Sequence, residues 1–262
     1  NIWISSFGND SLYVFQNADH HQSIGYQEYH GSGPFDVAVA SDGSAWVSNS
    51  GGLDGSFPSS VARYDLVNGA LERRFIRFLG NTLRGIAVDS NGNAWVGSLG
   101  DNKVYGIQPD GTEVGSFTGG GMDGPWDVAV DGEDNLWIAN FGPVQAGSNF
   151  TDGRLTKLAG TNPASRPANK RTGDPISPAS GYTVPSAGEQ VLLHNGDPLY
   201  GPGADPSYAP MMRQTAVVID QAGNIWSVNN WKPDFDTDAT ANPGGDGIII
   251  FVGLAAPPPQ MP

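Results

Sequence analysis

The stretch GIAVDSNGNAWVGS, from Gly85 to Ser98, decides the fold because versions of it recur along the chain. Similar segments run from Asp36 to Asn49 (DVAVASDGSAWVSN), from Asp127 to Asn140 (DVAVDGEDNLWIAN) and from Thr215 to Val228 (TAVVIDQAGNIWSV), and a fifth begins at the first residue with NIWISS. Their tryptophans are Trp3, Trp46, Trp95, Trp137 and Trp226, at spacings of 43, 49, 42 and 89 residues. A recurring segment at this spacing indicates a repeat architecture.

Each copy has the pattern of a β-hairpin. A short apolar run such as residues 37–39 is typical of a strand buried on both faces. Turn formers such as Asn91-Gly92 supply the positive φ that a tight hairpin needs, and the tryptophan lies on the second strand. Third strands are expected at residues 60–64 and 103–107, and fourth strands at residues 73–78 and 112–117.

Four strands in one repeat of this length correspond to one blade of a propeller. A lone four-stranded sheet cannot cover both of its faces, whereas blades stacked around an axis bury each other. We therefore expect an all-β fold, a β-propeller of four-stranded blades with five blades recognisable, and six or seven as the alternative for a complete chain. Small residues suit the first strand near the axis, and the tryptophans suit the wider space between blades. The small residues are Ala38, Ala87 and Ala129.

Two segments carry a resemblance to known proteins: GPFDVAV, from Gly33 to Val39, and GPWDVAV, from Gly124 to Val130. Together with the Gly-Asn-x-Trp turns, they resemble the NHL-repeat propellers and the related propellers of the virginiamycin B lyase type. The resemblance covers about two-thirds of the chain and implies the propeller fold, which hosts many unrelated activities.

The lyase resemblance implies a histidine after the Gly-Pro pair and a Glu-x-His at the end of a tryptophan-bearing strand, acting with magnesium. Here Phe35 and Trp126 follow the Gly-Pro pairs. The only Glu-x-His is residues 28–30, at the end of a predicted outer strand and away from the axis. The sequence therefore argues against this activity.

Metal-dependent lactonase-type propellers are the other implied activity, and they hold a divalent ion with a Glu, an Asn and an Asp placed just before an inner strand. The aligned positions in this sequence are Phe35, Arg84, Trp126 and Gln214. The nearby aspartates are displaced by one residue, which turns a strand side chain to the opposite face. This departure argues against the lactonase chemistry.

Five polar residues at the strand ends are the candidate ligand-binding set. They are Asp36, Asn49, Asp127, Asn140 and Asn229. Around a propeller axis they would ring the mouth of the channel and bind a polar ligand. The local alternative is that these Asp and Asn side chains bond the backbone of their own turns, and the residue types favour it.

A second candidate is a calcium loop at residues 234–238. Alternating carboxylates resemble the first half of an EF-hand-like loop, and calcium requires six to eight oxygen ligands. The candidate ligands are Asp234, Asp236, Asp238 and Asp246. Ala239 stands where such a loop has glycine, so a solvated acidic loop is the competing interpretation.

Composition bounds the partners. The formal net charge of −14 repels phosphate backbones and argues against nucleic-acid binding. No apolar run is long enough to predict a membrane span, and the absence of cysteine excludes disulfides and thiolate metal sites. The 37 glycines and 20 prolines among 262 residues favour turns over helices.

The repeat is interrupted between Trp137 and Trp226, where we expect a long loop insertion at about residues 159–212 within a single domain spanning residues 1–262. Residues 154–158 predict a third strand there, and residues 190–194 a late fourth. The first blade lacks its inner strand and the last its outer strand. Either further blades precede this sequence, or the exposed edges pair with another molecule by strand addition.

These observations favour a non-enzymatic binding and scaffold module, secreted or periplasmic, that binds a protein, a glycan or another polar small molecule. One alternative is a divalent-metal-dependent hydrolase or lyase acting at the channel mouth. The other is a structural subunit of an extracellular assembly that self-associates through its exposed blade edges.

Overall fold

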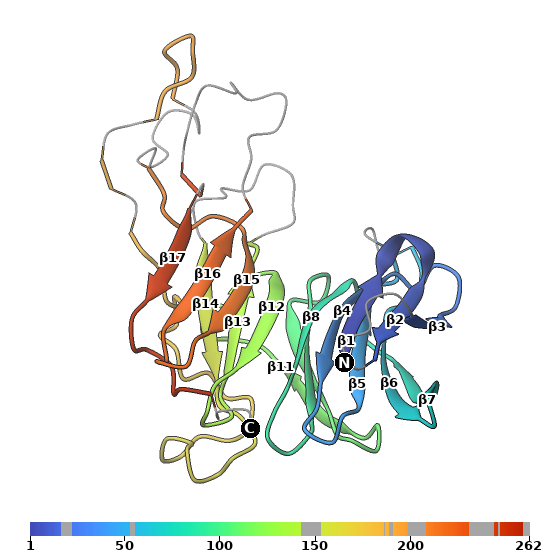
Figure 1. The fold of residues 1–262 in the computed structure, drawn as a ribbon. Coiled ribbons are helices and arrows are strands. Elements are labelled where there is room, and N and C mark those ends of the chain that lie inside the picture. The colour runs from blue at the N-terminus through green and yellow to red at the C-terminus, as the bar shows by residue number, and fades with distance from the viewer. Residues whose placement is uncertain are drawn as a thin grey trace.

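The computed structural model describes residues 1–16, 23–52, 56–142, 153–185, 187–188, 191–198, 208–230, 244–245 and 247–258. In these residues the strands form five antiparallel sheets, which we number as blades 1 to 5 in chain order (Figure 1). The only other regular element among them is a single 3-10 turn, Phe7–Asn9. The described part of the chain holds no helix long and apolar enough to cross a membrane.

Blades 2 and 3 have four strands each, and blades 1, 4 and 5 have three in the residues described. Blade 1 consists of β1 (Ile2–Ser6), β2 (Ser11–Phe15) and β3 (Ser23–Gln27), and blade 2 of β4 (Pro34–Val39), β5 (Ala45–Asn49), β6 (Ser60–Val67) and β7 (Ala70–Phe78). Blade 3 consists of β8 (Leu83–Val88), β9 (Ala94–Ser98), β10 (Lys103–Ile107) and β11 (Glu113–Phe117). Blade 4 consists of β12 (Pro125–Val130), β13 (Leu136–Asn140) and β14 (Arg154–Leu158), and blade 5 of β15 (Gln214–Ile219), β16 (Ile225–Asn229) and β17 (Ile248–Phe251).

Neighbouring blades contact each other through their innermost strands. Strand β4 packs between β1 and β8, and β12 packs between β8 and β15, so that these five strands follow one another side by side (Figure 1). Within each blade, chain order and spatial order coincide. This radial stacking of meander sheets confirms the expected β-propeller with five recognisable blades.

In blades 2, 3 and 4 the tryptophan of the repeat packs against the blade that follows it. Trp46 shares a buried cluster with Leu83 and Ile86 of blade 3, and Trp95 shares one with Val128 of blade 4. The same arrangement places Trp137 against blade 5. The side chains of Trp46, Trp95 and Trp137 are completely buried, which confirms their expected role in the packing between blades. Burial of side chains of this size is a large part of what holds a stacked array together.

An aspartate at the start of the hairpin turn fixes the tryptophan in three blades. Asp131 accepts a hydrogen bond from the Trp137 indole Nε1 at 3.0 Å and another from the backbone N–H of Asn135 at 2.9 Å. Asp89 and Asp220 bond the tryptophans of blades 3 and 5 at the same distance. Each carboxylate thus both closes the turn and orients the indole. This aspartate belongs to the repeat, although the Gly-Asn-x-Trp pattern does not include it.

Blade 2 departs from this pattern. Its equivalent position is Ala40, and the buried Nε1 of Trp46 has no hydrogen-bond partner among the described residues. The turn is closed instead by Asp42, which accepts from both the backbone N–H and the hydroxyl of Ser44. Arg63 lies over the Trp46 ring at 5.7 Å from its centroid and forms an ion pair with Asp42.

Two sequence expectations are wrong in detail. The repeat in blade 5 begins one residue later than the gapless alignment places it. The strand pairing shows this, because Val228 pairs with Ala216 and not with Thr215. The expected fourth strand at residues 190–194 does not form in its described part, where Leu192 bridges only to Pro198. The outer edge of β14 is bridged instead by Tyr182 and Pro175. Proline-rich sequence cannot sustain a hydrogen-bonded ladder, which explains why isolated bridges replace a strand.

Replacing Asp131 with alanine should destabilise the fold by about 3 kcal/mol, because it leaves an indole N–H, turn N–H groups and the Lys157 ammonium without their carboxylate. Chemical unfolding monitored by circular dichroism measures this loss. The matched control is Asp110→Ala, since the exposed Asp110 bonds only its own turn at Thr112 and should cost less than about 1 kcal/mol. Equal losses in the two variants would contradict the proposed role of the Asp-Trp bond.

Candidate functional site

A β-bulge interrupts the beginning of all four innermost strands in blades 2 to 5. The pairing shifts between Pro34 and Asp36 in β4, and between Pro125 and Asp127 in β12. A shift also occurs between Gln214 and Ala216 in β15, and a longer one between Leu83 and Ile86 in β8. A bulge leaves a residue unpaired in the hydrogen-bonded ladder, and its side chain no longer follows the alternation between the two faces of the sheet. The unpaired residues are Phe35, Arg84, Gly85, Trp126 and Thr215.

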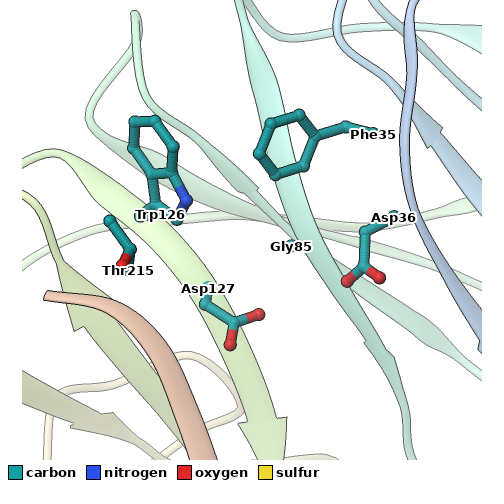
Figure 2. Close-up of a pocket in the computed structure, with 6 residues that line it drawn as sticks. All are labelled: Phe35, Asp36, Gly85, Trp126, Asp127 and Thr215. Carbon is teal, nitrogen blue, oxygen red and sulfur yellow. The ribbon is translucent and has the colours of Figure 1, made fainter. Parts of the chain in front are cut away.

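A pocket of about 220 Å³ lies where these bulges meet, and residues from four blades line it. The lining residues are Phe35, Asp36, Gly85, Trp126, Asp127 and Thr215. Figure 2 shows the rings of Phe35 and Trp126 on one side of the pocket and the carboxylates of Asp36 and Asp127 on the other. The pocket therefore combines an aromatic side with an acidic side.

Each carboxylate bonds its own strand and the next blade. Asp36 accepts from the backbone N–H of Val37 at 2.8 Å and from that of Ile86 in blade 3 at 3.0 Å. Asp127 does the same in the next pair of blades, with Val128 and with Val217 of blade 5 at 2.9 Å. Each of the two aspartates thus links the inner strand of its own blade to the inner strand of the next blade.

The equivalent positions in blades 3 and 5 carry residues without a carboxylate. Gly85 occupies the equivalent position in blade 3, and Ala216 occupies it in blade 5. A Cβ atom at Gly85 would lie 2.0 Å from Asp127 Oδ1, so a larger residue would displace that carboxylate. The absence of a side chain at Gly85 is therefore a steric requirement of the pocket beside Asp127.

Burial raises the pKa of both carboxyl groups. Desolvation is the main cause for Asp36, and the backbone N–H of Ile86 partly offsets it. Desolvation and the nearby charge of Asp36 raise the pKa of Asp127 to about 7, against the bond from Val217. Asp127 therefore exchanges a proton near neutral pH, which is unusual for an aspartate and typical of a functional site.

A buried arginine lies behind the aromatic side of the pocket. The guanidinium of Arg84 lies 4.8 Å from the ring centroids of both Phe35 and Trp126, and the residue is only 2% exposed. It donates to the hydroxyl of Ser50 and to its neighbour's carbonyl oxygen. Burial lowers its pKa to about 10, so Arg84 remains positively charged at neutral pH. Cation–π attraction at such distances fixes the two rings in place.

A second aromatic contact extends this cluster. Trp126 stacks on Phe141 at a centroid distance of 4.6 Å, and it meets Phe35 edge to face at 5.8 Å. Arg213 lies over Phe141 at 5.0 Å. The indole N–H of Trp126 has no acceptor among the described residues, so the aromatic side also offers one hydrogen-bond donor.

The structure brings two of the five candidate ligand-binding residues together, Asp36 and Asp127. The three asparagines bond their own surroundings instead. Asn49 donates to Ser60, Asn140 accepts from the N–H of Asp123, and Asn229 accepts from the N–H of Met212. Asn49 and Asn140 are completely buried, so the local interpretation describes these side chains.

The candidate calcium ligands Asp234, Asp236, Asp238 and Asp246 lie outside the described residues. Within the described part of the chain, no group of three or more histidine, aspartate or glutamate side chains is placed to hold a metal ion. No binding role was predicted from the sequence for Arg84, Phe35 or Trp126. Their signal in the sequence is that they occupy the same position, directly before the inner-strand residues 36, 85 and 127.

As pH rises from about 4 to about 7, the free energy of unfolding of the wild type should fall relative to that of Asp127→Asn. A carboxyl group whose pKa is raised on folding favours the folded state while it is protonated, and this advantage is lost as it ionises in the folded state. The relative loss should reach up to about 4 kcal/mol. Urea unfolding of both proteins across this pH range measures it. Parallel stability curves would show that burial does not raise the pKa of Asp127.

Comparisons with known proteins agree with this architecture. No protein-family model matches the sequence, and no curated protein is significantly similar to it. A solved gluconolactonase-like protein is similar at 14% identity with a TM-score of 0.56, over 98% of this chain and 72% of its own. A streptogramin B lyase is similar at 13% identity with a TM-score of 0.50, over 86% of this chain and 71% of its own. A functionally unknown protein from Desulfotomaculum acetoxidans is similar at 14% identity with a TM-score of 0.51, over 98% of this chain and 86% of its own. At these identities the likeness concerns the fold alone, and it agrees with the β-propeller described above.

Proposed function

We propose that the chain is a binding module whose channel pocket takes a small hydroxyl-rich ligand of the size and chemistry of a monosaccharide. The observation that carries the proposal is the meeting of two aromatic rings with two carboxylates around one cavity of about 220 Å³. Binding sites typically combine apolar walls with a few convergent polar groups in this way. The polar or glycan ligand expected from the sequence would therefore bind in this one pocket.

The carboxylates supply the acceptors for such a ligand. Each of these backbone hydrogen bonds uses one lone pair of an Asp36 or Asp127 oxygen, and a carboxylate has about four lone-pair sites in all. The backbone bonds therefore hold both groups in place and leave them acceptor capacity. Hydroxyl groups can donate to these oxygens, and Asp127 can also donate in its protonated form near neutral pH.

The aromatic side supplies the complementary contacts. The apolar C–H groups of a sugar ring pack against aromatic side chains, and the Trp126 indole N–H can donate to a ligand hydroxyl. Arg84 and Phe141 hold the Trp126 ring from the protein side. The pocket wall is therefore rigid before a ligand arrives, which lowers the entropic cost of binding.

Acid–base catalysis on a bound sugar or lactone is the second candidate function, and the raised pKa of Asp127 favours it. A catalytic acid or base works best with a pKa near the operating pH. Asp36 lies in the same pocket and raises the pKa of Asp127 further, so the pair can divide the two roles. The gluconolactonase-like and lyase structures that share this fold make lactones reasonable substrates to include.

The test is calorimetric titration of the wild type and Trp126→Ala with a panel of monosaccharides and sugar lactones, followed by NMR of each mixture over time. The proposal predicts at least a tenfold loss of affinity in Trp126→Ala, corresponding to about 1.4 kcal/mol. Phe78→Ala is the matched control, because Phe78 is 56% exposed on an outer strand and should leave affinity unchanged.

The outcomes separate the two functions. Binding without chemical change of the ligand supports the binding module. Conversion by the wild type that disappears in Asp127→Asn supports the catalytic alternative. If no member of the panel binds, or if Trp126→Ala binds as tightly as the wild type, the pocket is not the site.

A further inference from the structure

Asp36 and Asp127 reach the same short stretch of β8 from the blades on its two sides. Asp36 accepts a hydrogen bond from the backbone N–H of Ile86 at 3.0 Å. A Cβ atom on the preceding residue, Gly85, would lie 2.0 Å from Asp127 Oδ1. Because consecutive Cα atoms are only about 3.8 Å apart, the two carboxylates come close together where both line the pocket (Figure 2). We call Asp36 and Asp127 the carboxylate pair.

No basic side chain among the described residues neutralises the carboxylate pair. The inner strands β4, β8, β12 and β15 carry three charged side chains, which are Arg84 and the pair itself. Arg84 lies against the rings of Phe35 and Trp126, and it lowers the pKa of neither carboxyl group. The hydrogen bonds that the pair accepts from the described residues come from backbone N–H groups. Two acidic groups therefore face one cavity without a counter-charge.

Other buried acids of this protein have compensation that the pair lacks. Glu28 forms an ion pair with Arg73 at 3.3 Å, and Asp131 forms one with Lys157 at 3.2 Å. Asp89 accepts hydrogen bonds from an amide, an indole and a hydroxyl group of other side chains. A carboxylate that is withdrawn from water is costly without such partners. A ligand that brings both a positive charge and hydrogen-bond donors would therefore be stabilised at the pair.

We propose that the ligand of this pocket carries an ammonium group, as an amino sugar does, and that this group binds between Asp36 and Asp127. The inference rests on the proposed function and adds the charge of the ligand to it. An ammonium has three N–H donors, and the pocket offers it both carboxylates and the Thr215 hydroxyl as acceptors. Hydrogen bonds between charged groups are the strong ones, and the remainder of the sugar packs against the aromatic side.

The charge of the whole protein favours the same kind of ligand. The formal net charge of −14 raises the concentration of cations near the surface and in its clefts. A divalent metal ion fits this pocket less well than an ammonium does. Calcium takes six to eight oxygen ligands, and the described residues place no group of three or more acidic or histidine side chains to hold an ion.

Binding of an ammonium should release a proton. At pH 6 Asp127 is mostly protonated in the free protein, because burial and the charge of Asp36 raise its pKa to about 7. A positive charge beside it favours the ionised form, so the proton leaves as the ligand binds. Amino groups remain charged at this pH. A neutral sugar brings no charge and should bind without this release.

The experiment compares glucosamine with glucose, which has a hydroxyl in place of the amino group, by calorimetric titration at pH 6 in two buffers of different ionisation enthalpy. Glucosamine should bind at least tenfold more tightly and release close to one proton per ligand. This preference should disappear in Asp36→Asn and Asp127→Asn. It should persist in the control Asp110→Asn, which removes an exposed carboxylate outside the pocket. Circular dichroism melts establish that each variant is folded, and the two sugars on the wild type decide the matter if a pocket variant is not.

The outcomes distinguish this inference from the proposed function. Equal affinity for the two sugars, or glucosamine binding without proton release, overturns the ammonium site and leaves the proposed sugar pocket standing. A preference for glucosamine that survives in both pocket variants, or that is lost equally in Asp110→Asn, also overturns it, because the amino group is then not recognised by the pair. If neither sugar binds the wild type, the proposed function fails and this inference fails with it.

Discussion

The structure depends on the packing of the tryptophans of blades 2, 3 and 4 against the blade that follows each of them. A sheet of three or four strands has two faces to cover, and only stacking covers both. The buried Trp46, Trp95 and Trp137 form these contacts, and in blades 3 to 5 an aspartate holds the indole through a hydrogen bond. Blade 2 shows that packing is the stronger requirement, because Trp46 is equally buried without that bond.

The candidate site follows from the same stacking. Blades that converge on an axis bring their innermost strands together, and the bulge at the start of each strand turns one side chain into the space between them. Asp36 and Asp127 then join adjacent blades through backbone bonds, and these bonds also fix the carboxylates in the pocket. The residues that hold the blades together are therefore the residues that give the pocket its chemistry, so a change in one alters the other.

The fold could be predicted from the sequence because its signals are local and repeated: a period, a turn and a tryptophan. The candidate site could be predicted only in part. Asp36 and Asp127 stand out as acids at strand starts, but the bulge that decides their direction has no sequence signal of its own, and the same bulge position is filled by Phe35, Arg84 and Trp126. The gapless alignment of blade 5 was wrong by one residue because it set Ile225, and not Trp226, level with the tryptophans of the other blades. Aligning the tryptophans makes Ala216 the first residue of this copy, as the strand pairing has it. An asparagine that binds a ligand and one that bonds its own surroundings look alike in sequence. Only the buried contacts of Asn49 and Asn140 show that these two side chains have the local role.

The central claim is that the pocket between Phe35, Trp126 and the two aspartates is where this protein meets its ligand. The most direct measurement is the indole region of a ¹H–¹⁵N NMR spectrum during titration with monosaccharides, with the Trp126 resonance assigned from Trp126→Phe. The account predicts that the Trp126 indole signal shifts in a saturable way, while the signal of Trp226, which is 38% exposed and does not line the pocket, stays in place. A spectrum in which Trp126 does not move at any ligand concentration, while another tryptophan does, would contradict it.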